Sequence, residues 1–293
     1  MVLPLKLRVI GSRRMYRFFL PSAGEFESCE FVHILPSEEE TQFAQLPADG
    51  ALTIVVDPDD YKPADLDNIP NPVVFWFLRR FGAVWGNQIP GATVLLREAR
   101  QQLNSRLDFL RSLTLSENRF VVVSDEDSRE LLASAGCLSV LSPPPVSKEI
   151  SRATAQKPAT PKISLYAERN DLTSAMASRI HSFVSPGDID LQKSEGAVIL
   201  SENILPSFPY PVAVGASLGW TIFSSRLGPR WGLEAGLDYV EISTPEELFH
   251  AVLAFRKNSS QFQLMRFRVV SKSVHFAADR VWSRLLANLG LVR

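Results

Sequence analysis

The sequence contains no hydrophobic run that approaches the roughly 18–20 residues of a membrane span. Its first residues, MVLPLKLRVIGSRR, lack the long apolar block and the small-residue cleavage site of a secretion signal. Their alternation instead predicts a first β-strand. We therefore predict a cytoplasmic protein without an integral membrane segment.

Cysteine and histidine are scarce. Cys29 and Cys137 lie far apart in the chain of 293 residues, and the four histidines form no cluster. Because neither metal-type spacing nor a disulfide framework is present, we predict reduced thiols and no protein-bound catalytic metal. Positive charge is not in excess either, since the chain has 31 Lys and Arg residues and 32 Asp and Glu residues. This balance argues against a nucleic-acid partner.

Hydrophobic residues, in contrast, make up 45% of the chain, which is enough for real cores, and the length favours two domains. In residues 1–145, short apolar strands alternate with capped helices. This alternation predicts a parallel sheet flanked by helices, that is, a Rossmann-like domain. The expected strands cover residues 7–10, 31–34, 51–56, 73–78, 120–123 and 138–141, and the expected helices cover 95–113 and 128–135.

A stretch rich in Pro, Ser, Ala and Lys follows, and it predicts a linker over residues 146–162. A second Rossmann-like domain is expected at 163–275. An amphipathic helix at 276–293 ends the chain and possesses an apolar face that needs a groove. The expected strands of the second domain cover residues 163–166, 188–191, 197–200, 220–223 and 239–242, and the expected helices cover 172–183, 212–218 and 245–256.

Ligands of open α/β sheets bind at the carboxyl ends of the strands. In the second domain this rule points to the loop after Phe223 and to the start of the helix at Pro211. In the first domain it points to Gly11 and Ser12, which follow the first strand. An ordinary strand–helix turn is the alternative interpretation of that glycine.

The second half resembles the carboxyl-terminal domain of GT-B glycosyltransferases, in particular the bacterial group-1 and spore-maturation-like enzymes. The matching residues are a small-residue helix that ends at Gly219, a strand Thr221-Ile222-Phe223-Ser224, and a glycine-containing loop, 228–236. The patterns Leu237-Asp238-Tyr239 and Thr244-Pro245-Glu246-Glu247-Leu248 continue the match. The resemblance implies two Rossmann-like domains that face each other across a cleft, with a C-terminal helix that crosses back to the first domain.

The resemblance also implies a metal-independent transfer of a sugar, of the hexosyltransferase type, from a UDP- or GDP-linked donor to a saccharide, a lipid-linked or a protein acceptor. The leaving diphosphate must then be neutralised by an arginine and by helix amides. Arg169 and Glu234 are the candidate catalytic residues. The candidate donor-site residues are Ser201, Glu202, Asn203, Ser217, Gly219 and Arg230, and the candidate acceptor-side residues are Gly11 and Ser12.

Each of these residues also has a purely structural interpretation. Arg169 can pair with a neighbouring carboxylate on the surface, and Arg230 with Glu234 inside the loop. The run Ser201-Glu202-Asn203 can be a plain turn.

One position departs from the family pattern, which usually has a glutamate where Val214 stands here. This departure keeps open a second function, that of a catalytically inactive glycosyltransferase-like binding or scaffold protein. A third possibility is another two-domain α/β protein of the periplasmic-binding type, and the missing signal peptide argues against it.

Overall fold

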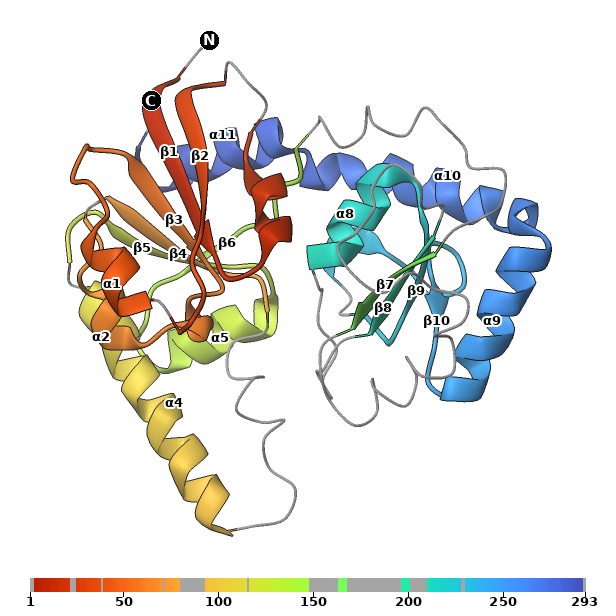
Figure 1. Cartoon of the computed structure of the whole chain (residues 1–293), viewed down its shortest axis with the longest axis horizontal. Helices are drawn as coiled ribbons and strands as arrows, with labels where there is room; N and C mark the ends of the chain where they lie inside the picture. The colour runs from red at the N-terminus through yellow and green to blue at the C-terminus, as the bar shows by residue number, and fades with distance from the viewer. Residues whose placement is uncertain are drawn as a thin grey trace. The chain divides into compact units, whose positions relative to one another are not determined.

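The computed structural model describes residues 3–21, 25–37, 39–70, 72–79, 93–114, 116–147, 163–167, 196–200, 210–227 and 230–291. The chain forms two compact units (Figure 1). Unit 1 comprises Met1–Pro145 and Ala278–Arg293, and unit 2 comprises Val146–Ala277. Each described helix is too short or too polar to cross a membrane.

Unit 1 is built on a six-stranded sheet in the order β2-β1-β3-β4-β5-β6, and all of its strand pairs are parallel. The apolar runs of β3 and β4 are buried along their whole length, as strands covered on both faces should be. The strands are β1 (Leu3–Gly11), β2 (Phe26–His33), β3 (Leu52–Val56), β4 (Val73–Phe77), β5 (Arg119–Val123) and β6 (Val140–Leu141).

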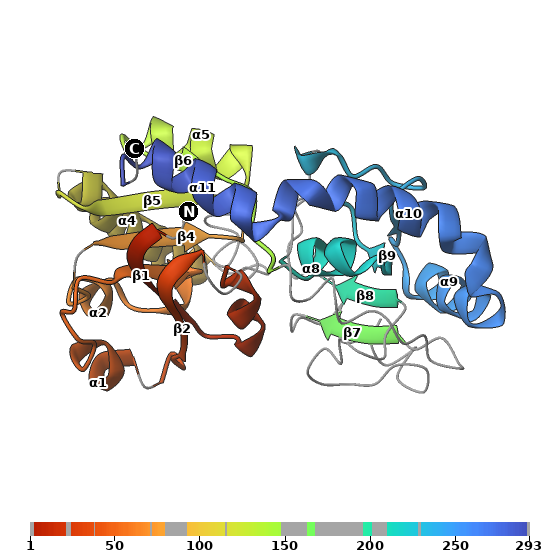
Figure 2. The same ribbon diagram turned by 90° about the horizontal axis from the view of Figure 1, so that it is seen from above.

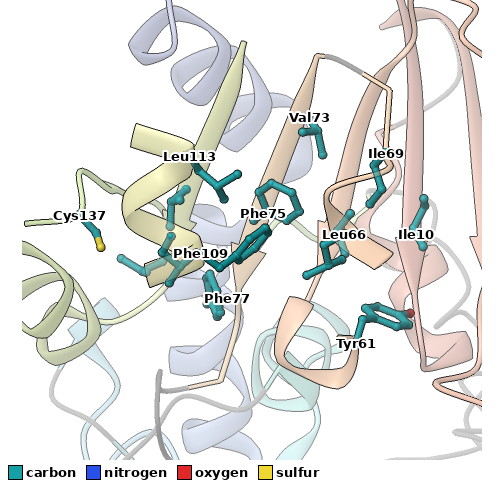
Figure 3. Packing of buried hydrophobic residues seen from close by; sticks show 14 of the residues in the cluster. Ile10, Tyr61, Leu66, Ile69, Val73, Phe75, Phe77, Phe109, Leu113 and Cys137 are labelled. Atoms are coloured by element: carbon teal, nitrogen blue, oxygen red, sulfur yellow. The ribbon is translucent and has the colours of Figure 1, made fainter. Parts of the chain in front are cut away.

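One face of this sheet packs on α4 (Thr93–Thr114). Figure 3 shows Phe75 of β4 beside Phe109 of α4, whose ring centroids are 5.6 Å apart. The shorter helices of the unit are α1 (Glu39–Ala44), α2 (Pro63–Leu66) and α5 (Glu126–Ser134), with the 3₁₀ turns η1 (Arg14–Phe19) and η2 (Pro58–Asp60). Asp125 begins α5 by accepting a hydrogen bond from the Ser128 amide at 2.7 Å.

The opposite face of the sheet packs on α11 (Ala278–Asn288), which follows unit 2 in the chain but belongs to unit 1. Trp76 alternates with Phe75 along β4 and therefore points to this second face. It contacts Trp282 of α11, with ring centroids 5.6 Å apart. The Trp282 indole also donates a hydrogen bond to the Phe19 carbonyl at 3.1 Å. The expected return of the C-terminal helix to the first domain is therefore confirmed.

Unit 2 contains a four-stranded parallel sheet in the order β10-β9-β8-β7. Its strands are β7 (Ile163–Ala167), β8 (Gly196–Leu200), β9 (Thr221–Ser224) and β10 (Val240–Glu241). Its helices are α8 (Tyr210–Leu218), α9 (Pro245–Lys257) and α10 (Gln263–Lys272), with the 3₁₀ turns η4 (Arg230–Gly232), η5 (Ser259–Phe262) and η6 (Ser273–Phe276). Figure 2 shows α10 lying along α8, and the two helices are in contact.

Sequence and structure agree on how the helices of unit 2 begin and end. Thr244 and Glu247 form a reciprocal capping box at the start of α9, with Pro245 at its first position. The helix expected at 212–218 begins two residues earlier, at Tyr210, and places Pro211 in its first turn. Gly219 ends it with a left-handed φ of 67°. The strand expected at 188–191 and the helix expected at 172–183 lie outside the described residues.

Candidate functional site

The sheet of unit 1 reverses its strand order between β1 and β3. Ligands of open α/β sheets bind at such a point, outside the carboxyl ends of the strands. At the carboxyl ends of these two strands lie Gly11, the last residue of β1, then Ser12, and the residues Asp57 to Asp60 after β3. The first candidate site is therefore this edge, which we call the unit 1 edge.

Asp57 is the centre of a buried network at the unit 1 edge. Its Oδ1 atom accepts hydrogen bonds from the Leu78 amide at 2.9 Å and from the Arg79 amide at 3.0 Å. Its Oδ2 atom accepts a hydrogen bond from the Tyr16 hydroxyl and lies 3.3 Å from Arg79 Nε. Asp57 also has a left-handed φ of 48°, which is uncommon for a residue other than glycine. Asp57 thus fastens together the chain segments that follow β1, β3 and β4.

Asp60 and Arg79 extend the network. Asp60 accepts hydrogen bonds from the Ser12 hydroxyl and from the Arg79 guanidinium. Burial alone would lower the pKa of Arg79, but the carboxylates of Asp57 and Asp60 outweigh it and raise this pKa. Arg79 therefore stays charged, and the oxygens of Asp57 and Asp60 are engaged within the protein.

Asp59 differs from its two neighbours. Its Oδ1 atom is buried and makes no hydrogen bond to any residue that the structure describes. Burial raises the pKa of Asp59 to about 7, although Arg106 and Arg79 act in the opposite direction. A carboxyl group that titrates near neutral pH can exchange a proton with a bound substrate. Asp59 is therefore the carboxyl group of the unit 1 edge that we consider for proton transfer.

Gly11 is required here for a reason that the sequence did not indicate. A Cβ atom at this position would lie 2.3 Å from Tyr16 Cδ2. Glycine therefore makes room for the tyrosine that holds Asp57, and the hydroxyl of Ser12 is engaged with Asp60. The structure thus places both predicted acceptor-side residues at the unit 1 edge, where they support the carboxylate network.

The second candidate site is the carboxyl edge of the unit 2 sheet, which we call the unit 2 edge. The strand register aligns Ala167 with Leu200 across β7 and β8, and Ile199 with Ser224 across β8 and β9. Ser224 is fully buried, and its hydroxyl makes no hydrogen bond to any described residue. A buried hydroxyl without a partner costs free energy unless a ligand or another group satisfies it. Ser224 therefore marks this edge as a place where a polar group, from a ligand or from another part of the chain, would be stabilising.

Several predicted donor-site residues follow the strands of this edge in the chain. Arg169 stands two residues after the end of β7, and Ser201, Glu202 and Asn203 come directly after β8. All four lie outside the described residues. The backbone of Arg230 belongs to η4, in the loop that follows β9.

Two further predicted donor-site residues, Ser217 and Gly219, lie at the carboxyl end of α8. Ser217 donates a hydrogen bond from its hydroxyl to the Ala213 carbonyl at 2.9 Å. Gly219 accepts one from Arg266 Nε at 2.7 Å, and a Cβ atom on it would lie 2.8 Å from Val270 Cγ2. The close approach that Gly219 permits in the structure is therefore that of α10.

The loop between β9 and β10 is held by Asp238, which is fully buried. Asp238 accepts hydrogen bonds from Lys272, from the Glu234 amide at 2.8 Å and from Arg268 Nε at 3.1 Å. Burial alone would raise the pKa of Asp238, but these bonds outweigh it and lower the pKa. The Glu234 carboxylate is exposed and lies 3.4 Å from Lys272 Nζ. The structure thus gives Glu234 an ion pair with Lys272.

Asp57, Asp59 and Asp60 are not among the site residues that the sequence predicted. The available signal was the position of three carboxylates directly after a confident strand. Among the described residues, no group of three His, Cys, Asp or Glu side chains could hold a metal ion.

No protein-family model matches the sequence, and no curated protein matches it in a sequence comparison. Solved structures do match, over nearly the whole chain. Sucrose-phosphate synthase from Thermosynechococcus elongatus aligns with a TM-score of 0.61 at 11% identity, over 98% of this chain and 99% of that chain. Anabaena HepE in complex with UDP-glucose aligns with a TM-score of 0.56 at 9% identity, over 98% of this chain and 100% of that chain. A glycosyltransferase from Rickettsia africae aligns with a TM-score of 0.53 at 11% identity, over 98% of each chain.

These matches span both units, and the HepE structures among them were solved with UDP or UDP-glucose. At a sequence identity of 9–11%, a structural likeness of this kind establishes the fold alone. The predicted fold class is therefore confirmed: the chain has the two-domain α/β fold of the GT-B glycosyltransferases.

Proposed function

We propose that the protein is a glycosyltransferase that moves a sugar from a nucleotide-diphosphate donor to an acceptor hydroxyl without a protein-bound metal. The observation that carries this proposal is the likeness over 98% of the chain to structures solved with UDP and with UDP-glucose. Because the likeness covers both units, it supports a complete donor and acceptor architecture and not a single nucleotide-binding domain.

The unit 2 edge is the proposed donor site. Ser224 offers a buried hydroxyl that makes no hydrogen bond to a described residue, and α8 begins after β8 of the same sheet. In the transition state, negative charge grows on the diphosphate as its bond to the sugar breaks. Arg169 is proposed to neutralise that charge, and Ser201, Glu202 and Asn203 to contact the nucleoside.

The unit 1 edge is the proposed acceptor side. The acceptor oxygen attacks the anomeric carbon, the bond from this carbon to the diphosphate oxygen breaks, and the acceptor proton must be taken up. Asp59 is proposed to take this proton, since its pKa of about 7 keeps a large share of the carboxyl group ionised at neutral pH. Asp57, Asp60 and Arg79 hold the turn on which Asp59 stands.

Titration calorimetry with UDP, GDP, ADP and their sugars tests the donor site. We expect one nucleotide series to bind. Arg169→Ala should weaken diphosphate binding by about 1–3 kcal/mol, because a charge-assisted contact is lost. Arg284→Ala, which removes an exposed arginine of α11, is the matched control and should leave affinity unchanged. Absence of binding across the whole panel would refute the proposal.

Ser224→Ala separates a ligand role from a structural one. If the Ser224 hydroxyl binds the donor, this variant should bind nucleotide more weakly but lose no stability, because the removed group makes no hydrogen bond to a described residue. A loss of stability together with unchanged affinity would assign Ser224 to the fold.

A non-catalytic glycosyltransferase-like binding protein is the second candidate. The observation that favours it is Val214, a fully buried side chain in α8 at the position where the family usually has a glutamate. Measurement of donor hydrolysis and of sugar transfer beside binding decides between the two. Binding without either turnover would establish the non-catalytic alternative.

A further inference from the structure

Arg106 is a charged residue on the side of α4 that faces the sheet of unit 1. It stands three, four and seven residues before the buried residues Phe109, Leu110 and Leu113, by which α4 packs on the core (Figure 3). Residues at these intervals share one side of a helix. The side chain of Arg106 therefore lies next to the core, and its guanidinium reaches η2, the turn that follows β3.

The guanidinium of Arg106 holds the η2 turn by its backbone. It donates hydrogen bonds to the Pro58 carbonyl at 3.2 Å, to the Asp59 carbonyl at 3.3 Å, and to the Tyr61 carbonyl. The last carbonyl groups of a helical turn lack partners within it, so a side chain that satisfies them fixes the turn. Arginine suits this task because its donors form a rigid planar fork. Arg106 therefore fixes the backbone of the residue whose carboxyl group is the proposed proton acceptor.

Arg106 also acts on the Asp59 carboxyl group through its charge. Burial raises the pKa of Asp59 to about 7, and Arg106 is the strongest of the charges that oppose this effect. Arg79 opposes it as well, but Arg79 contacts Asp57 and Asp60, and both of these carboxylates raise the same pKa. The hydrogen bonds from Arg106 to η2 go to neutral carbonyl groups, so they do not neutralise its charge. Loss of Arg106 should therefore shift Asp59 toward its protonated form.

We propose that Arg106 is a positioning residue of the unit 1 edge, which fixes the η2 turn and keeps the Asp59 carboxylate able to take the proton of the acceptor hydroxyl. This inference rests on the proposed function, in which that proton moves to Asp59 as the acceptor oxygen bonds to the anomeric carbon. Arg106 acts on the reaction only through Asp59. Without its charge, burial would leave Asp59 mostly protonated at pH 7, and a protonated carboxyl group cannot serve as the base.

Carbon-13 NMR of the full chain, with its aspartate carboxyl groups labelled, measures the ionisation of Asp59 without any substrate. The Asp59→Asn variant identifies the signal by its absence. In the native chain we expect a midpoint of about pH 7. Arg106→Gln removes the charge and should raise the midpoint to about pH 8, whereas Arg106→Lys keeps the charge and should stay close to the native value. The matched control is Arg111→Gln, which removes an exposed arginine of the same helix and should leave the midpoint unchanged.

The pH profile of sugar transfer separates a positioning role from a purely structural one. A midpoint that rises from about pH 7 to about pH 8 leaves about a fifth of the native carboxylate at pH 7, so Arg106→Gln should transfer sugar about fivefold more slowly there. At about pH 9 the variant and the native chain should have nearly equal rates, since Asp59 is then ionised in both. A structural defect would lower the rate by the same factor at every pH.

The proposal is overturned if Arg106→Gln has the native midpoint, or if its loss of activity does not vary with pH. Circular dichroism establishes that each variant is folded. If Arg106→Gln does not fold, Arg106→Lys decides the question, because a midpoint near pH 8 in that variant would refute the role of the charge.

The inference and the proposed function can fail separately. A raised midpoint in Arg106→Gln, in a chain that transfers no sugar, would refute the proposed function and leave the effect of Arg106 on Asp59 intact. Sugar transfer by the native chain, together with an unmoved midpoint in Arg106→Gln, would refute the role of Arg106 alone.

Discussion

Replacement of Trp282 by alanine should destabilise unit 1 selectively. The indole is 1% exposed, and its ring packs against Phe19, Phe26 and Trp76 at centroid distances of 6.0, 6.0 and 5.6 Å. Loss of a buried tryptophan costs about 3–5 kcal/mol, and the buried Phe19 carbonyl left without its 3.1 Å donor adds about 1–3 kcal/mol. The expected total of about 4–8 kcal/mol is comparable with the whole stability of an ordinary domain.

Hydrogen exchange followed by mass spectrometry is the appropriate measurement, because it reports on the two units separately. In Trp282→Ala, the amides of β3 and β4 should lose most of their protection, while those of β9 and α9 should keep theirs. Arg284→Ala, on the exposed side of the same helix, should change neither unit. If β3 and β4 stay fully protected in Trp282→Ala, the role given to α11 in the core of unit 1 is wrong.

Three further substitutions follow from the two edges. Gly11→Ala should lower the unfolding free energy by about 1–3 kcal/mol, since the added Cβ would lie 2.3 Å from Tyr16 Cδ2. Gly215→Ala is the control, because a Cβ there would have its nearest neighbour at 3.5 Å. If urea denaturation shows equal losses of stability in the two variants, the steric argument is wrong. Asp238→Asn should cost about 1.5–3 kcal/mol at pH 7 through the loss of charge-assisted hydrogen bonds. Because the pKa of Asp238 is lowered by folding, its stabilising effect is present above the ordinary carboxyl pKa and disappears as pH falls through the lowered value, so native and variant melting temperatures should converge in acid. Asp59→Asn should have the opposite pH dependence. The raised pKa of about 7 means that ionisation of Asp59 opposes folding increasingly from about pH 4 to pH 7, so the variant should be more stable than the native chain at pH 8 by at least about 1 kcal/mol and equal to it at pH 4. A stability difference that does not vary with pH would show that Asp59 titrates normally.

The sequence predicted those features of the fold that depend on local pattern. The apolar runs at 51–56 and 73–78 became β3 and β4 within one residue at either end, because continuous apolar strands have few alternatives to the middle of a parallel sheet. The start of α9 at Pro245 was predictable because Thr244 and Glu247 have the spacing of a capping box. The strand expected at 31–34 was too short, since β2 runs from Phe26 to His33 with mostly exposed or half-buried residues that carry little apolar signal.

The candidate site was less predictable because its contacts join distant parts of the chain. The Tyr16 hydroxyl lies 41 residues from Asp57 in the chain, and Arg79, whose amide and guanidinium both contact Asp57, lies 22 residues from it. No local sequence pattern predicts contacts at such separations. The same holds for Gly11, whose strict requirement comes from the ring of Tyr16. The positions that follow β7 and β8 remain predictions, since Arg169, Ser201, Glu202 and Asn203 lie outside the described residues.

The return of α11 to unit 1 has a consequence for how the protein is made. Synthesis proceeds from the amino terminus, so the six strands of unit 1 leave the ribosome well before the helix that supplies Trp282. Until that helix emerges, the face of the sheet that carries Phe19, Phe26 and Trp76 lacks its cover, while unit 2 already has all of its strands. Nascent chains stalled near residue 277 should therefore expose an aromatic surface that chaperones bind, and release of the last helix should remove it.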